Sequence, residues 1–244
     1  MIPVIGEILP LLYQFYGTVF QPLLAIGPYI SLGFFSTMLA LAFSLIYFLL
    51  VDREKMDEIK DKLSEHQEKM NEAKKNDEDD KSSEHMKKTM ELNQKMMKLN
   101  LKPMIGTMVF VALIFPWLSH VYAPSIKMNH TGNNTFTGNL EYAGQNKQIT
   151  VKNTSTPQIL VGSQNATIGG DIKAFNIEWD VKQFGEKNKG FFSEGGYTHL
   201  KLNAKFIKLP FSIPLAGTAL NWLGFYMIII MPLTYIFRKL LGVQ

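Results

Sequence analysis

The chain has 244 residues and no cysteine, which excludes disulfides and any catalytic or metal centre built on thiols. Charge is missing from long stretches: no Asp, Glu, Lys or Arg occurs in residues 29–51, 103–123 or 209–237, which hold 23, 21 and 29 residues. A helix of about 20 apolar residues crosses the ~30 Å hydrocarbon core of a bilayer. The sequence therefore predicts an integral membrane protein with three spans.

Basic residues are absent from the first 52 positions, so the positively charged start of a secretory signal peptide is missing. Polar and apolar residues of segment 1–28 fall on opposite helical faces, which predicts an uncleaved helix lying in the membrane interface, on the outside. The alternative is a fourth span, because residues 8–51 are wholly uncharged, although Pro10, Pro22 and Pro28 interrupt that stretch.

Charge is concentrated in residues 52–102, which hold 13 basic and 14 acidic residues. This balance favours solvated helices over a nucleic-acid surface, so no DNA partner is expected. Apolar positions recur there at spacings of three and four, the seam of a coiled coil. We expect an antiparallel coiled-coil hairpin that folds back near residues 75 and 76 and sets His66 against His85 or Met86. The seam positions are Met56, Ile59, Leu63, His66, Met70 and Ala73.

Residues 124–208 are rich in Asn, Thr and Gly, and short alternating runs at 148–151, 172–181 and 197–209 predict strands of a small β-rich domain. All four Asn-x-Ser/Thr sequons of the chain fall in this segment and are candidate glycosylation sites. They are Asn129, Asn133, Asn153 and Asn165.

Basic residues near the ends of spans remain cytoplasmic, and they flank residues 52–102 and follow the last span at Arg238 and Lys239. The fold class expected is a membrane α-helical protein with spans at 29–51, 103–123 and within 209–244, which ends in a short cytoplasmic tail. The hairpin and the C-terminus lie in the cytoplasm, whereas the N-terminus and the β-rich domain between spans 2 and 3 lie outside.

No catalytic motif is present. The five histidines lack metal-ligand spacing, and the glycine pairs at 169–170 and 195–196 lack the helix and Lys-Ser/Thr of a nucleotide-binding loop. No enzymatic activity, cofactor or metal is expected. His66 and His85 could form a pH-sensitive or metal-binding pair, but the simpler interpretation is two partly exposed seam histidines.

Polar residues inside the spans are costly in lipid unless they face a protein interior or a watery groove. Three spans are too few to fill a bundle, so a polar-lined groove is one interpretation, and close packing of the spans is the other. The candidate groove-lining residues are Ser36, Ser44, Tyr47, Thr107, Ser119, Asn221, Thr234 and Arg238.

Methionines are concentrated in the charged segment and continue into the second span. Flexible thioether side chains suit a surface that binds clients sharing hydrophobicity but not sequence, whereas the alternative is that they fill the seam. The candidate client-binding surface comprises Met56, Met70, Met86, Met90, Met96, Met97, Met104 and Met108.

Four short motifs carry a family resemblance: Lys-Pro-Met at 102–104, Leu-Pro-Phe-Ser-Ile-Pro at 209–214, Asn-Trp-Leu-Gly-Phe-Tyr at 221–226 and Arg-Lys-Leu-Leu-Gly at 238–242. With the order of elements, they make the chain resemble the archaeal YidC-like branch of the Oxa/YidC superfamily of membrane-protein insertases, related to the insertase subunit of the ER membrane protein complex. The resemblance implies a cell-membrane protein whose groove accepts the hydrophilic flank of a nascent span without nucleotide hydrolysis. Its partners would be nascent membrane-protein segments and the lipid bilayer, with the ribosome and a Sec translocon as further candidates.

The chain departs from that family in two respects. The family usually has a basic residue inside its groove, but the first two spans have none, so either Arg238 reaches into the groove or the groove is neutral. The β-rich insertion is also unusual. Two other functions stay open: a structural or sensory protein with a ligand-binding β-domain outside, and an oligomeric ion-conducting pore.

Overall fold

The computed structural model describes residues 3–187, 196–213 and 217–243. The chain forms two compact units. The first unit comprises Met1–Met38 and Leu113–Met231, and the second comprises Leu39–Ala112 and Pro232–Gln244.

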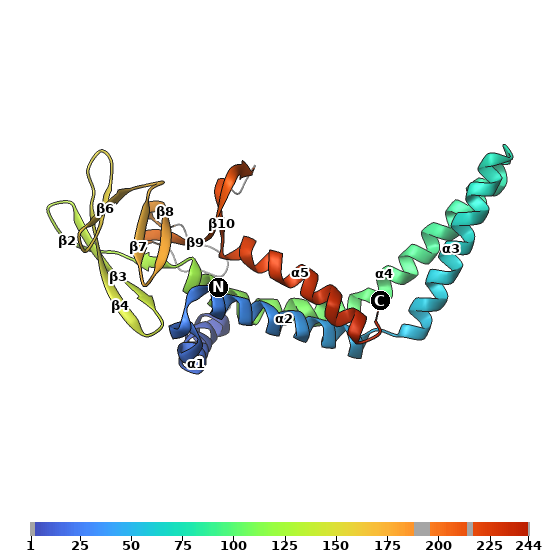
Figure 1. Ribbon diagram of the computed structural model, residues 1–244, viewed down its shortest axis with the longest axis horizontal. Coiled ribbons are helices and arrows are strands. Elements are labelled where there is room, and N and C mark those ends of the chain that lie inside the picture. Colours follow the sequence, from blue (N-terminus) through green and yellow to red (C-terminus); the bar gives the residue numbers. More distant parts are fainter. Residues whose placement is uncertain (1–2, 188–195, 214–216, 244) are drawn as a thin grey trace. The chain divides into compact units, whose positions relative to one another are not determined.

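Five helices occur in the described residues (Figure 1): α1 (Pro3–Ile26), α2 (Pro28–Leu50), α3 (Arg53–Lys75), α4 (Asp79–Tyr122) and α5 (Trp222–Leu240). Of these, α2, α4 and α5 are long and apolar enough to cross a membrane. The prediction of three membrane helices is therefore confirmed at the level of length and composition. α1 is not one of the three, and its location in the membrane interface stays a prediction.

α1 and α2 are separated by Gly27, whose φ of 143° lies in a region that side chains disfavour. α1 then packs through Phe20 against the buried Phe35 of α2 and Trp117 of α4, at ring-centroid distances of 4.9 and 5.5 Å. Phe35 and Trp117 are themselves 5.2 Å apart. This aromatic cluster is the helical part of the core of the first unit.

In the described residues, ten strands follow the second membrane helix, which confirms the predicted β-rich region. They are β1 (Ser125–Lys127), β2 (Asn129–Gly132), β3 (Thr135–Tyr142), β4 (Gln145–Lys152), β5 (Gln158–Val161), β6 (Gln164–Thr167), β7 (Asp171–Ala174), β8 (Ile177–Glu186), β9 (Thr198–Ile213) and β10 (Gly217–Asn221).

The strands form two antiparallel sheets. One has the order β1-β9-β8-β7, with β10 also paired to β9, and the other has the order β2-β3-β4-β5-β6. Side chains from β3 and β8 meet between them: Phe136 lies 5.4 Å from Phe184, and Tyr142 lies 6.5 Å from the fully buried Trp179. Alternating inward residues of both sheets form the β-domain core, as the alternating sequence runs predicted.

Residues 172–181 form a hairpin, β7 and β8, rather than the single strand that their alternation predicted. Phe175 and Asn176 make the turn with φ values of 56° and 59°, the conformation of a two-residue hairpin loop. The Trp179 indole donates a hydrogen bond to the Ala174 carbonyl oxygen at 3.1 Å and holds the turn closed. Asn favours such turns, but Phe does not, so the sequence signal was weak.

The third apolar stretch contains one membrane helix, as predicted, but that helix begins later than expected. The first part of the stretch continues β9 to Ile213, and Gly217–Asn221 return as β10, with Ala219 opposite Lys208 and Leu220 opposite Ile207. Helix α5 begins only at Trp222. Hydropathy does not distinguish an apolar strand from a membrane helix. In β10 the backbone groups pair with the long strand β9 instead of forming helical hydrogen bonds.

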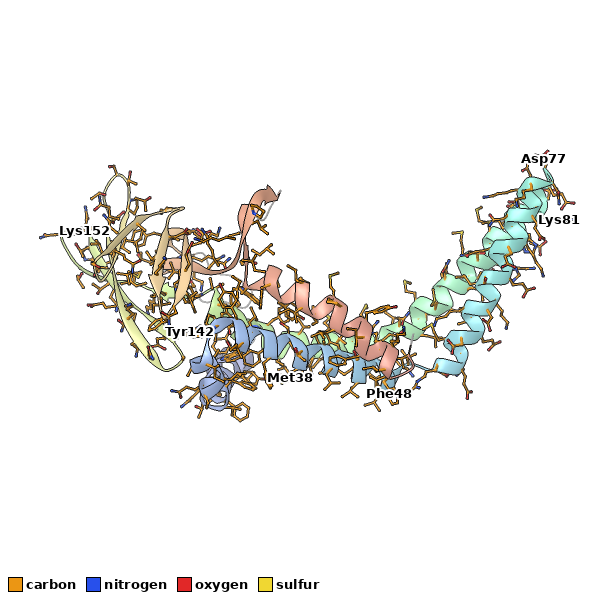
Figure 2. The ribbon with its side chains drawn as sticks, in the orientation of Figure 1. Met38, Phe48, Asp77, Lys81, Tyr142 and Lys152 are labelled. Atoms are coloured by element: carbon orange, nitrogen blue, oxygen red, sulfur yellow. The ribbon has the colours of Figure 1, made fainter. Side chains whose placement is uncertain are left out.

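In the second unit, α3 and α4 lie side by side and are joined by residues 76–78 (Figure 1). The Asp52 side chain caps α3 by accepting a hydrogen bond from the Lys55 backbone amide, and Asp77, with φ of 54°, lies at the tip (Figure 2). His66 and His85 face each other with their Nδ1 atoms 3.1 Å apart, as the folding-back predicted. The coiled-coil character of the α3–α4 seam stays a prediction.

Candidate functional site

Tyr47, Asn100 and Arg238 form a polar cluster in the second unit, which we call the Tyr47 cluster. The Tyr47 hydroxyl of α2 donates a hydrogen bond to Asn100 Oδ1 of α4 at 3.0 Å, and Asn100 Nδ2 donates to the Met96 carbonyl oxygen at 3.1 Å. Both polar groups are half-buried. The amide thus satisfies the tyrosine hydroxyl and its own helix backbone at once, and it ties α2 to α4.

Arg238, in the last turn of α5, contributes the charge of this cluster. Its guanidinium carbon lies 4.2 Å from the centre of the Tyr47 ring, a cation–π contact. Its Nε is buried without a hydrogen-bond partner among the described residues. All nine ion pairs between described residues involve lysine, so Arg238 has no carboxylate partner among those residues. The cluster therefore presents a half-buried cation with donor capacity to spare.

Sequence reasoning identified Tyr47 and Arg238 but missed Asn100. The sequence feature that could have identified Asn100 is its amide side chain just before the Lys-Pro-Met motif, where the charged segment changes to an apolar stretch. Because α4 runs unbroken from Asp79 to Tyr122, this position lies within one helix rather than at the boundary between a hairpin and a span. Its partner on α2 became evident only from the packing of the two helices.

The predicted serines lie elsewhere. Ser36 and Ser44 are fully buried, and each hydroxyl donates to the carbonyl oxygen four residues earlier, Leu32 or Ala40, at 2.8 Å. Such bonds satisfy a hydroxyl within its own helix. Both serine hydroxyls are therefore satisfied within their own helix, and a groove-lining role for these serines stays a prediction.

Thr107, Ser119 and Thr234 are half-buried. The Thr107 hydroxyl donates to the Met104 carbonyl oxygen at 2.9 Å, so it too bonds within its own helix. Asn221 caps α5, because its Oδ1 accepts the Gly224 backbone amide at 3.0 Å. The position read from sequence as a costly amide inside a span is thus the start of a helix, where asparagine is among the favoured residues.

The methionines separate into two groups. Met56 is buried, and Met70 and Met96 are half-buried, as expected for residues between α3 and α4. Five others on α4 are exposed, with 71 % of Met108 and 63 % of Met97 accessible. These five, together with the exposed Leu101, form what we call the methionine stripe: Met86, Met90, Met97, Leu101, Met104 and Met108.

Positions of the methionine stripe are separated by 4, 7, 4, 3 and 4 residues, so they share one face of α4. At ~1.5 Å per residue the stripe is roughly 33 Å long. A cavity of about 410 Å³ lies between α3 and α4, lined by Ile59, Leu92 and Leu99 and by four lysines with one glutamate. An apolar stripe and a basic cavity therefore occur on the same pair of helices.

The charged faces of α3 and α4 are stabilised by pairs within each helix. Hydrogen bonds from Lys62 and Lys69 hold the pKa values of the Glu58 and Glu65 carboxyls below their usual range. These exposed pairs fit a solvated helix surface and leave the apolar stripe as the unusual feature of the hairpin. No group of three or more metal-ligating side chains occurs in the described part of the chain.

All four sequon asparagines are exposed, and they lie on strands of the β2–β6 sheet or in loops directly joined to them. Asn129 and Asn165 lie in β2 and β6, Asn133 follows β2, and Asn153 follows β4. Each side chain is accessible for modification if this domain lies outside the membrane.

Residues 17–148 match the protein family described as integral membrane protein EMC3/TMCO1-like. The matched segment covers more than half of the chain and contains Tyr47, Asn100 and the methionine stripe, whereas Arg238 lies beyond it. Comparisons with curated proteins and with solved structures found no match. The chain therefore belongs to the EMC3/TMCO1-like family of integral membrane proteins, which is part of the Oxa1/YidC/EMC insertase-related group.

Proposed function

We propose that this protein is a YidC-like insertase of the archaeal type, which helps nascent transmembrane segments to enter the cell membrane without nucleotide hydrolysis. The observation that carries the proposal is a half-buried arginine without a carboxylate partner in the described residues, in the same compact unit as an exposed apolar stripe. Membership of the insertase-related group supports it.

The methionine stripe would bind the apolar part of a client. A segment of about 20 apolar residues exposes a large apolar surface, which is unfavourable in water. Thioether side chains can pack against different apolar sequences. Transfer into lipid then contributes about 0.8 kcal/mol for each CH₂ group removed from water. This free energy drives insertion, so the protein needs to lower the barrier rather than supply energy.

The Tyr47 cluster would act on the hydrophilic flank of the client. A charged side chain at the bilayer centre costs about 2.5–3.5 kcal/mol on insertion scales. The Arg238 guanidinium offers a cation and its terminal N–H groups to acidic or carbonyl groups of that flank. We propose that the long Arg238 side chain reaches the polar path from the end of α5, because the first two predicted spans contain no basic residue.

The proposed orientation follows the distribution of basic residues. Lys95, Lys98 and Lys102 precede the apolar half of α4, and Arg238 and Lys239 end α5. These positions would face the cytoplasm, with the N-terminus and the β-domain outside. The four exposed sequons are compatible with that orientation. Nascent membrane-protein segments are the proposed partners, with a ribosome or a Sec translocon delivering them.

Insertion by purified protein in lipid vesicles tests this function, with a single-span reporter that carries a short acidic tail. Arg238→Gln removes the charge and should lower the yield of inserted reporter several-fold, while Arg238→Lys should retain most of it. Lys239→Gln is the matched control, because it removes a neighbouring exposed charge outside the Tyr47 cluster. Equal insertion by wild-type and Arg238→Gln protein, or equal insertion into empty vesicles, would refute the proposal.

A further inference from the structure

A cavity of about 450 Å³ lies in the first unit, where the β-domain meets the first turn of α2. Cavities that bind small molecules have volumes of about 300–1,000 Å³, so this one is large enough for a polar head group. Its lining residues come from four regions of the chain. They are Pro28 and Tyr29 of α2, Lys147 of β4, residues 173–178 of the β7–β8 hairpin, and Lys205, Phe206 and Lys208 of β9.

One wall of the cavity is held in an uncommon backbone conformation. Phe175 has a φ of 56°, which is rare for a bulky residue, and its ring stacks on Tyr142 with the centroids 6.0 Å apart and the planes 28° apart. The Lys147 ammonium lies 5.8 Å from the centre of the same Phe175 ring. Stacking thus fixes an aromatic wall with a cation beside it.

The cavity is positively charged. Four lysines and one glutamate line it. Lys205 is paired with Asp171 at 2.6 Å, and Lys208 with Glu178 at 2.9 Å. The remaining two, Lys147 and Lys173, form no ion pair with any described residue. The excess charge at this site is therefore carried by Lys147 and Lys173, and it favours an anionic ligand.

The floor of the cavity is the beginning of a membrane helix. Tyr29 is the second residue of α2, and its hydroxyl donates a hydrogen bond to the Phe206 carbonyl oxygen at 2.8 Å. The two rings also meet edge to face at 5.4 Å. Half of Tyr29 remains accessible. Tyrosines are enriched where membrane helices leave the hydrocarbon core, so this contact places the cavity at head-group level.

We propose that this cavity binds the phosphate-bearing head group of an anionic phospholipid, with Lys147 and Lys173 as the residues that contact the phosphate. A lipid head group satisfies both observations, because it carries an anionic phosphate and lies in the membrane interface, where α2 begins. A soluble phosphate compound would satisfy only the charge. The proposal assigns a role to the β-domain and does not depend on the insertase function.

The test measures lipid binding to the full-length protein in neutral detergent by native mass spectrometry. Wild-type protein should bind phosphatidylglycerol and discriminate against phosphatidylcholine. The double variant Lys147→Gln/Lys173→Gln should bind phosphatidylglycerol about tenfold or more weakly, because it removes the two lysines of the cavity that form no ion pair with a described residue. The matched control is Lys152→Gln/Lys201→Gln, which removes the same charge from exposed strand positions outside the cavity and should bind like the wild type.

A photoactivatable phosphatidylglycerol locates the site. Crosslinks to the β7–β8 turn that depend on Lys147 and Lys173 would support the proposal. Equal binding by the cavity variant and the control would overturn it, provided that circular dichroism shows both to be folded. Displacement of the lipid by inorganic phosphate at equal concentration would also overturn it, because the cavity would then bind free phosphate.

Discussion

Tyr47 uses both parts of its side chain, the ring against Arg238 and the hydroxyl to Asn100. Tyr47→Phe retains the ring and leaves Asn100 Oδ1 without its donor. We expect a loss of about 1 kcal/mol in the free energy of unfolding, measured in detergent, with insertion activity largely kept. Tyr235→Phe, which changes an exposed ring of α5, should have no effect. An equally large loss in a protein that already carries Asn100→Ala would show that the hydrogen bond is not the cause.

We expect His199 to make the stability of the β-domain depend on pH. Burial lowers the pKa of its imidazole, and Nδ1 lies 3.0 Å from the Gly185 carbonyl oxygen. The unfolded chain therefore binds a proton more readily than the folded one. The resulting stability is complete above the unfolded pKa of about 6.5 and is lost as the pH falls through the folded value.

We thus expect the melting temperature of the β-domain transition to fall between about pH 7 and pH 5, and His199→Gln to flatten that fall. Thermal unfolding at several pH values measures it. His130→Gln changes an exposed histidine on the other sheet and serves as the control. Parallel curves for His199→Gln and wild-type protein would contradict the assignment.

At the scale of elements, the single helix α4 contains both the second arm of the predicted hairpin and the predicted second span. Because it is one helix of 44 residues, the methionine stripe continues without a break from the charged segment into apolar sequence. A photo-crosslinking residue at Met97 or Met104 should capture a nascent span, and one at the buried Met56 should not. Ribosome-bound chains stalled at increasing lengths provide the measurement. Equal capture from all three positions would exclude the stripe as the binding face.

The contact between α2 and α4 depends on Gly106. A Cβ atom at this position would lie 2.9 Å from Ile46 and 3.1 Å from Leu50, so the two helices approach closely there. Gly106→Leu should overpack this contact and lower the free energy of unfolding by about 1–3 kcal/mol. Gly17→Leu is the control, because nothing lies within 4 Å of that position. Comparable melting temperatures for the two variants would show that close packing at Gly106 does not contribute measurably to stability.

At the scale of the whole molecule, orientation can be tested directly because the chain has no cysteine. A single cysteine at Lys152 or at Lys81, both exposed (Figure 2), is a unique target for a membrane-impermeant maleimide. In intact cells we expect labelling at position 152, in the β-domain, and none at position 81, near the hairpin tip, until the membrane is permeabilised. The opposite pattern would reverse the proposed orientation.

Much of the architecture follows from local sequence properties. The three membrane helices could be predicted because long uncharged stretches are stable only in an apolar environment, and the β-rich region because its alternation has a period of two. The facing of His66 and His85 followed from seam spacing and the position of the turn. Tyr47 and Arg238 could be named as candidates because a polar side chain in or beside a membrane span is costly unless it faces other protein groups or water.

The remaining features depend on partners distant in sequence, which only the tertiary structure decided. Pairing of β9 with β10 places residues 209–213 and 217–221 of the third apolar stretch in a sheet, and α5 begins only at Trp222 with Asn221 as its cap. The packing of α3 on α4 decided which methionines are buried and which are exposed, since hydrophobicity is the same for both groups. Asn100 gained its role from a tyrosine on another helix, and the lysines of the cavity beside Tyr29 come from separate strands. Composition and period determine which segments avoid water, whereas long-range packing determines which surface each side chain meets.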